Sequence, residues 1–112
     1  MDVFFAPGRV DHECRTRAAR EERWGSAAAP IVGRRLFELA ALPRLSDALS
    51  LPGVRLRSYA GGDRYDVKCN FGIRMIVVPV DDRGSILNIH ADATRVTAIR
   101  VELLEFDSEG GA

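Results

Sequence analysis

The chain has 112 residues, which is enough to bury one hydrophobic core but too few to divide that core between two. Its composition, 46% hydrophobic and 29% charged, is ordinary for a globular protein and excludes an intrinsically disordered chain, and no apolar run approaches the roughly 20 residues that cross a bilayer. The formal net charge of zero excludes a strong general affinity for nucleic acid, so any surface that binds nucleic acid must be a local patch.

We expect one domain over residues 1–107 and a flexible tail over residues 108–112. Residues 1–5 lack the basic region and the long apolar stretch of a secretory signal, so the sequence predicts a cytoplasmic protein with no membrane partner. Cys14 and Cys69 have no Cys or His partner at metal-ligand spacing. In a reducing compartment such thiols are usually buried small hydrophobes, so we expect neither a disulfide nor a metal site.

The first third of the chain predicts one strand and two helices. Val3–Phe5 is a short apolar run closed by a Pro-Gly turn, which is typical of a strand. Residues 9–23 are charged and free of Pro and Gly, and their thin apolar stripe near helical spacing predicts an amphipathic helix on a surface. Gly25 ends this helix, and a second helix over residues 26–40 completes an antiparallel hairpin. The expected buried face of the second helix contains Val32, Leu36, Leu39 and Ala40.

The rest of the chain alternates like strands. Pro43 stops the second helix, and residues 46–49 can make one capped turn before a Leu-Pro-Gly turn at residues 51–53. The predicted strands are Val54–Tyr59, Arg64–Cys69, Ile73–Val80 and Thr97–Phe106. The predicted fold class is therefore α+β, with an N-terminal strand and a two-helix hairpin packed on one face of an antiparallel sheet of about four strands.

A sheet that is covered on one side only must sort its residues by parity, so the side without helices can be predicted. In residues 64–69 the odd positions are apolar and are expected to face the helices, whereas the even positions are charged. The same alternation in residues 54–59 and 73–80 places further basic residues on the uncovered side. The predicted basic surface consists of Arg55, Arg57, Arg64, Lys68 and Arg74.

This basic surface has two interpretations. Each residue can be an ordinary solvated strand position, with Asp63 and Asp66 as surface partners. Arg74 differs because it interrupts an otherwise apolar strand, so its guanidinium is expected to be partly sheltered and to need an anionic or carbonyl partner. It is either a site residue or one half of a structural ion pair.

Four segments carry a resemblance to a known family. Residues 51–56 read LPGVRL, residues 62–67 read GDRYDV, residues 73–77 read IRMIV and residues 96–105 read VTAIRVELLE. In this order they resemble the LPGxRL, GDRKGx(W/F)xV, (W/Y)R(I/L)xF and VTAIxIxE motifs of the HigB-like branch of the RelE/ParE toxins, from bacterial type II toxin-antitoxin systems. The similarity covers most of the chain, although the second segment is shorter than its counterpart.

The resemblance implies a RelE-like fold and a toxin that cleaves messenger RNA in the ribosomal A site without a metal or other cofactor. It implies three partners, namely a cognate helix-turn-helix antitoxin, the ribosome and messenger RNA, and assembly as a homodimer or a toxin-antitoxin hetero-oligomer. Arg74 matches the arginine of the third motif and Arg64 matches the second approximately, so these are the catalytic candidates. The planar guanidinium suits phosphate because it gives bidentate charged hydrogen bonds. The RNA-binding candidates are Arg55, Arg57 and Lys68.

The chain departs from the family at positions that would move protons. Residues 60–61, Ala and Gly, stand where the family has a lysine, Arg57 replaces a histidine, and no Tyr-His pair follows Asp107. Neither His12 nor His90 occupies the place of that histidine, and arginine stays protonated at neutral pH.

Two alternatives follow from these departures. The chain can be a catalytically inactive RelE/ParE-like protein that binds an antitoxin or, through its helical hairpin, DNA gyrase. It can also be an unrelated small binding domain.

Overall fold

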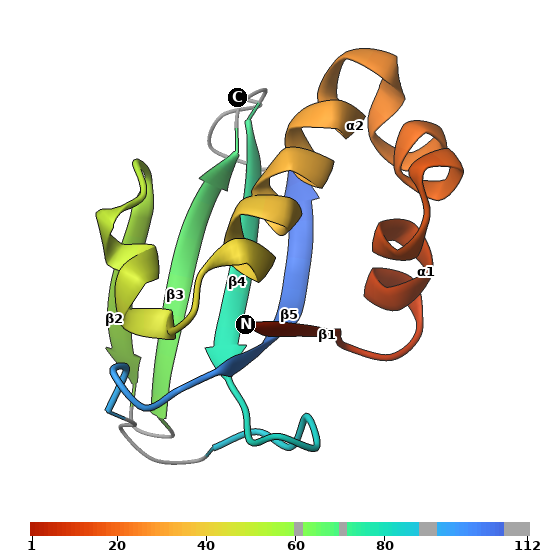
Figure 1. The fold of residues 1–112 in the computed structure, drawn as a ribbon. Coiled ribbons are helices and arrows are strands. Elements are labelled where there is room, and N and C mark those ends of the chain that lie inside the picture. Colours follow the sequence, from red (N-terminus) through yellow and green to blue (C-terminus); the bar gives the residue numbers. More distant parts are fainter. Residues whose placement is uncertain (60–61, 70–71, 88–91, 107–112) are drawn as a thin grey trace.

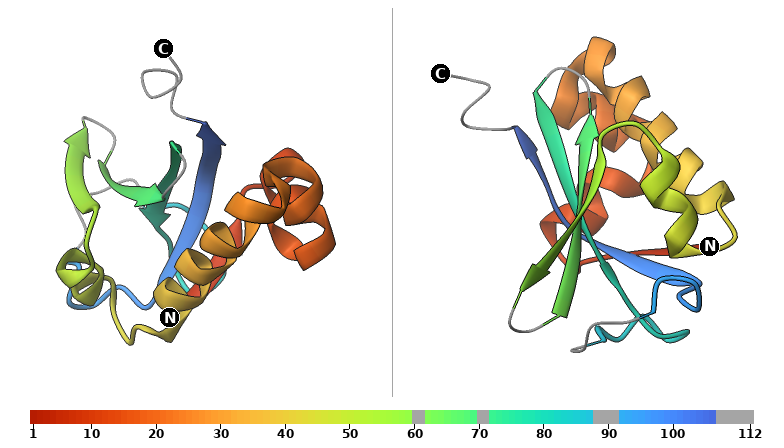
Figure 2. Two further views of the ribbon diagram at one scale, coloured as in Figure 1. Left: turned by 90° about the horizontal axis from the view of Figure 1, so that it is seen from above. Right: turned by 90° about the vertical axis from the view of Figure 1, so that its left-hand side faces the viewer.

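The described helices all lie on one face of a five-stranded sheet (Figures 1 and 2). The computed structural model describes residues 1–59, 62–69, 72–87 and 92–106. In chain order the elements are β1 (Asp2–Phe5), α1 (Arg9–Arg15), α2 (Arg17–Ala41), the 3-10 helix η1 (Leu45–Ser50), β2 (Val54–Tyr59), β3 (Gly62–Cys69), β4 (Ile73–Pro79) and β5 (Ala98–Phe106). The predicted α+β class is confirmed. No helix in these ranges is long and apolar enough to span a membrane.

The sheet is mixed, with the strand order β1-β5-β4-β3-β2. Neighbours from β2 to β5 pair antiparallel, whereas β1 runs parallel to β5, with Val3 opposite Ile99. The expectation of a purely antiparallel sheet of about four strands is therefore wrong. After β1 the chain runs through the helices and enters the sheet again at β2, on the opposite edge. Each strand from β3 to β5 then reverses the direction of the one before it, so β5 lies beside β1 and runs parallel to it. Apolar alternation identifies strands, but it does not identify the neighbour of an N-terminal strand.

The first predicted helix, residues 9–23, is interrupted at Thr16. This residue is extended, with φ −126° and ψ 156°, and its side chain accepts a hydrogen bond of 3.1 Å from the backbone N–H of Ala19. A threonine hydroxyl caps a helix well because it satisfies one of the N–H groups that lack a partner in the first turn. The predicted break at Gly25 is confirmed. It is a kink inside α2, where Gly25 has a positive φ of 85°, a conformation that glycine adopts more readily than other residues.

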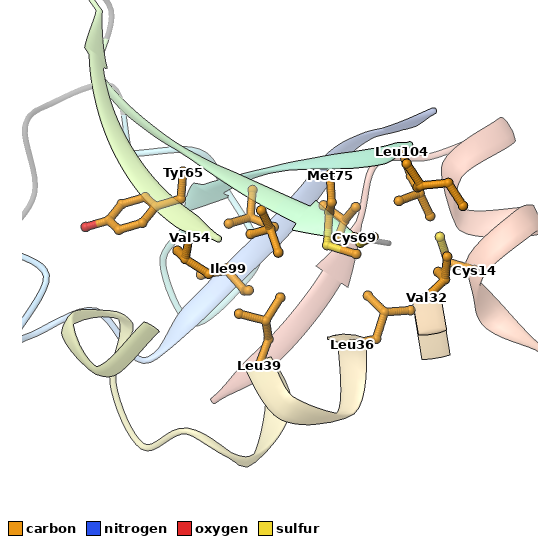
Figure 3. Packing of buried hydrophobic residues seen from close by; sticks show 14 of the residues in the cluster. Cys14, Val32, Leu36, Leu39, Val54, Tyr65, Cys69, Met75, Ile99 and Leu104 are labelled. Atoms are coloured by element: carbon orange, nitrogen blue, oxygen red, sulfur yellow. The ribbon is translucent and has the colours of Figure 1, made fainter. Parts of the chain in front are cut away.

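The second half of α2 packs on the sheet through one apolar stripe (Figure 3). Val32 and Leu39 are 0% exposed and Leu36 is 9% exposed, and all three belong to one core cluster with Met75 of β4. Ala40 was also expected on this face but is exposed, because the helix has turned past the stripe by that position. This stripe buries apolar side chains against the strands and so joins the two layers.

Two polar contacts fix the C-terminal end of α2 to the sheet. The N-terminal ammonium of Met1, next to β1, donates hydrogen bonds to the carbonyl oxygens of Ala40, at 2.7 Å, and of Leu42. The Nη2 of Arg35 donates a hydrogen bond of 2.5 Å to the carbonyl oxygen of Pro52, just before β2. A positive charge is favoured at a helix C-terminus, where carbonyls lack partners. The helix is thus held to strands at both edges of the sheet.

Both cysteines are free thiols in the core, as expected from the sequence. Cys14 of α1 is 2% exposed and Cys69 of β3 is 1% exposed. Burial raises the pKa of Cys14 to about 12, with a further contribution from neighbouring Glu13, and raises the pKa of Cys69 to about 11. Such thiols pack as small hydrophobes and are poor nucleophiles.

The packing of α2 predicts opposite effects for two of its neighbouring residues. Leu39→Ala should lower the free energy of unfolding by about 2 to 5 kcal/mol, because it removes a side chain that is 0% exposed and leaves a cavity. Phe37→Ala is the matched control, since Phe37 is 74% exposed, and should change stability by less than about 0.5 kcal/mol. Urea unfolding measures both. Equal losses in the two variants would contradict the described packing.

The buried thiols predict a loss of stability in alkaline solution. In the unfolded chain a thiol ionises near pH 9.0, whereas in the fold Cys14 and Cys69 stay protonated to about 12 and about 11. Above pH 9.0 only the unfolded chain releases these protons, so the thiol contribution to stability is fully present below pH 9.0 and is lost as the pH rises toward these folded values. Urea unfolding across this range should show a steeper decline for the wild type than for the variant Cys14→Ala/Cys69→Ala, and parallel curves would refute the prediction.

Candidate nucleic-acid interface

The face of the sheet opposite the helices is uncovered along the upper part of β3 and β4 (Figure 2, right). In β3 the predicted parity is confirmed: Tyr65, Val67 and Cys69 are each 1% exposed and face the helices. The alternate residues Arg64 and Lys68 are exposed on the other side. The uncovered side is therefore the polar side, as the alternation of residues predicts.

In β4 the same alternation holds, and the neighbouring strand β5 contains a β-bulge. Met75 is 0% exposed beneath the helices, and Arg74 is exposed on the open side. The register shifts between Ile76, which lies opposite Leu103, and Val77, which lies opposite Val101. Glu102 is therefore an extra residue of β5 with no opposite partner in β4. A bulge of this kind changes the parity of the strand that carries it.

The register aligns the basic residues across neighbouring strands. We call the positions Arg55, Arg57, Arg64, Lys68 and Arg74 the basic face. Arg57 is opposite Arg64, and Lys68 is opposite Arg74. For Arg57 only the backbone position is described. The structure thus brings all five predicted positions to one side of β2, β3 and β4.

Like charges in directly opposite positions weaken a sheet. The basic face has two such pairs, Arg57 with Arg64 and Lys68 with Arg74. One acidic position interrupts them, since Asp66 lies opposite Arg55. Excess positive charge on an uncovered surface favours an anionic ligand, and guanidinium groups suit phosphate in particular.

Arg74 is half-exposed beside one carboxylate. Its side chain is 47% exposed, and its Nε lies 3.9 Å from the Oε1 of Glu105, which is itself 41% exposed. This distance is an ion pair but not a hydrogen bond. The guanidinium is thus partly sheltered and has an anionic neighbour, as expected from the sequence, but the ion pair is loose. Arg74 retains its donors for a ligand.

The negative charges of the open side gather on β5. Glu105 lies opposite Arg74, and Glu102 accepts a hydrogen bond of 2.6 Å from the Nε of Arg100. The open side therefore has basic residues on β2 to β4 and carboxylates along β5. The sequence alone does not predict Arg100, Glu102 and Glu105 as residues of the open side, because strict alternation would place Glu105 on the opposite face from Arg100. The bulge at Glu102 brings both to the open side.

At its lower end, the open side is covered by the loop that follows β4 and contains Gly84. Val78, Val80 and Ala98 form a second buried cluster there, with Phe4 of β1 packed against it. Gly84 lies so close to this aromatic ring that a Cβ at that position would be 2.9 Å from its Cδ1. On β4 and β5 this leaves the end around Arg74 accessible, whereas on β3 both Arg64 and Lys68 are exposed.

The remaining candidates lie elsewhere. His12 is exposed on α1, on the helical side of the sheet, so it does not join the basic face. His90, residues 60–61 and the segment after Phe106 lie outside the described residues. Within the described ranges, no group of three or more His, Cys, Asp and Glu side chains could hold a metal ion.

A scan against protein-family models and searches of curated proteins and of solved structures found no match to this chain.

The exposure of Arg74 predicts that its removal leaves the fold intact. Arg74→Ala should lower the free energy of unfolding by less than about 1 kcal/mol, because a half-exposed ion pair contributes little. The adjacent Met75→Ala is the control and should cost about 2 to 5 kcal/mol, since its side chain is fully buried in the core. Urea unfolding of both proteins tests this. A large loss for Arg74→Ala would make it a structural residue and remove it from the candidate site.

Proposed function

We propose that the chain is the toxin of a type II toxin-antitoxin system, a RelE/HigB-like endoribonuclease that cleaves messenger RNA on the ribosome with a reduced catalytic set. The observation that carries this proposal is the gathering of five basic positions on the uncovered side of β2, β3 and β4. A net charge of zero leaves no general attraction for RNA, so a local concentration of this kind is what an RNA-binding protein with this composition requires.

The positions of the motifs support a RelE-like arrangement. The GDRYDV segment begins β3, the IRMIV segment forms most of β4, and the VTAIRVELLE segment leads into β5. These strands are adjacent in the sheet, so segments far apart in sequence form one surface. Arg74 lies on the central strand of this surface, between Lys68 of β3 and Glu105 of β5.

The proposed reaction is attack of the ribose 2′-oxygen on the adjacent phosphorus, with cleavage of the bond from phosphorus to the 5′-oxygen. The products are a 2′,3′-cyclic phosphate and a 5′-hydroxyl. Arg74 and Arg64 would bind the equatorial phosphate oxygens, on which negative charge increases in the transition state. Arg55, Arg57 and Lys68 would hold the flanking backbone and fix its orientation.

This reaction also requires a group that accepts the proton of the 2′-hydroxyl. Arginine remains protonated at neutral pH, so Arg74 cannot take that role. Glu105 is the carboxylate next to Arg74, at 3.9 Å, and a phosphate held by Arg74 would have its ribose within reach of this group. We assign the proton acceptor to Glu105, and the leaving 5′-oxygen takes its proton from water.

A cognate helix-turn-helix antitoxin is the proposed inhibitor. It would cover the basic face or pair with β2, the edge strand that carries Arg55 and Arg57. Either position places antitoxin between Arg55 and the RNA, so inhibition and RNA binding would compete. The toxin would be cytoplasmic and would act on the ribosome in its free form.

One observation favours a second function, in which the chain is a catalytically inactive binding protein that acts on an antitoxin or on DNA gyrase. Phe37 is 74% exposed on the outer side of α2, one turn from Arg34, and offers an aromatic anchor to a protein partner. The two functions use opposite sides of the molecule.

Controlled expression in bacteria, combined with mapping of messenger-RNA ends, tests the proposal. The wild type should arrest growth and create new RNA ends with 5′-hydroxyl groups. Arg74→Ala should abolish both effects. Arg34→Ala is the matched control, since this exposed arginine lies on the helical side of the molecule and should leave both effects unchanged.

The outcomes separate the two functions. Normal growth with no new RNA ends, from a protein shown to be folded, would reject the nuclease. Growth arrest that survives Arg74→Ala but disappears in Phe37→Ser would establish the binding function instead. Glu105→Gln should lower the cleavage rate by about 10²-fold or more while leaving RNA affinity intact, as expected for the loss of a proton acceptor.

A further inference from the structure

Two aliphatic side chains lie on the open side of the sheet, among its charges. Ile76 of β4 and Leu103 of β5 are directly opposite one another, and both are partly exposed. We call this pair the aliphatic island. The side of a sheet that faces water normally carries polar residues, so two adjacent aliphatic residues at this place need a physical reason.

The charges around the island follow from the register. Arg74 is two residues before Ile76 on the same strand, and Asp66 is opposite Ile76 on β3. Arg64 and Lys68, each two residues from Asp66, take the diagonal positions, which are about 7 to 8 Å from the island in a sheet of this kind. The island therefore has three basic residues and Asp66 along its β3 and β4 sides, and Glu105, two residues beyond Leu103, on its β5 side.

We infer that the aliphatic island holds an unpaired base of single-stranded RNA, while the basic face holds the phosphates on either side of it. This inference rests on the proposed function and names the form of RNA that the site accepts. An apolar surface beside basic residues matches a nucleotide, which has a planar face of low polarity next to an anionic phosphate.

Duplex RNA does not fit this surface. Its bases are stacked and paired, so it presents phosphates and 2′-hydroxyl groups to a protein and leaves the island without a contact. A single strand can turn a base away from its neighbours and place it against Ile76 and Leu103 while its phosphate reaches Arg74. The island would thus select unpaired RNA, and the basic residues would supply most of the affinity without sequence preference.

The affinity of the full-length protein for short RNA tests the inference. Fluorescence anisotropy compares a labelled single strand of about eight nucleotides with a blunt duplex of the same length, a size within the usual site of a small single-strand binding domain. The variant Ile76→Thr/Leu103→Thr keeps strand-forming residues but removes the apolar surface. It should weaken single-strand binding about tenfold and leave duplex binding unchanged.

Salt dependence separates the island from the basic face. The double threonine variant should keep the wild-type slope of log Kd against log salt, because no phosphate contact is lost, whereas Arg74→Ala should reduce that slope by about one. Leu49→Thr is the matched control, since Leu49 is an aliphatic residue, 45% exposed, on η1 at the helical side. It should bind RNA as the wild type does.

Crosslinking supplies a readout that needs no variant. A single strand with one 4-thiouridine should crosslink to peptides from residues 73–79 and 98–106, the strands that carry the island. Crosslinks confined to other peptides, or equal binding of single strand and duplex with no effect of the threonine variant, would overturn the inference and leave the proposed toxin in place.

The two proposals can also fail separately. If the folded protein binds no RNA by itself at low salt, the island inference is wrong. The growth and RNA-end experiment then decides the toxin proposal by itself, since cleavage that depends on the ribosome does not require binding to free RNA.

Discussion

The packing of one apolar stripe of α2 against one side of the sheet determines where the charged residues lie. Val32, Leu36 and Leu39 need apolar partners, and each strand supplies them from alternate positions. The remaining positions have to face away from the helices, whatever their charge. The basic face is therefore a consequence of the way the core is built, and it could not move to the helical side without burying arginines.

The charge arrangement of the open side has a cost that core packing does not explain. Lys68 lies directly opposite Arg74, so two like charges repel one another in the free protein, and Glu105 of β5 is the carboxylate opposite Arg74. Arg74 meets Glu105 only at 3.9 Å, with both side chains in water. A phosphate bound by Lys68 and Arg74 would add negative charge beside this pair, which is the physical basis of the ligand proposed for the basic face.

The sequence predicted most of β2, β3 and β4, because uninterrupted alternation assigns each residue to a face. This is why Lys68 and Arg74 were placed correctly on the uncovered side. Other features depend on information that a single strand does not contain. The parallel pairing of β1 depends on the path of the whole chain, the break at Thr16 depends on one hydroxyl, and the role of Glu105 depends on a bulge in a neighbouring strand.

The bulge at Glu102 makes the register of β5 as important as its composition. If the bulge closed with Glu102 in place, Glu102 would lie opposite Ile76 and residues 103–106 would each move on by one position. Leu104 would then face water, and Glu105 would enter the core. Loss of Glu102 itself has the opposite result, because β5 would pair with β4 in continuous register and residues 103–106 would keep their present partners. In evolution, this strand should therefore tolerate loss of the extra residue more readily than a change that closes the bulge around it, and a relative with a gap at Glu102 would keep the same open face.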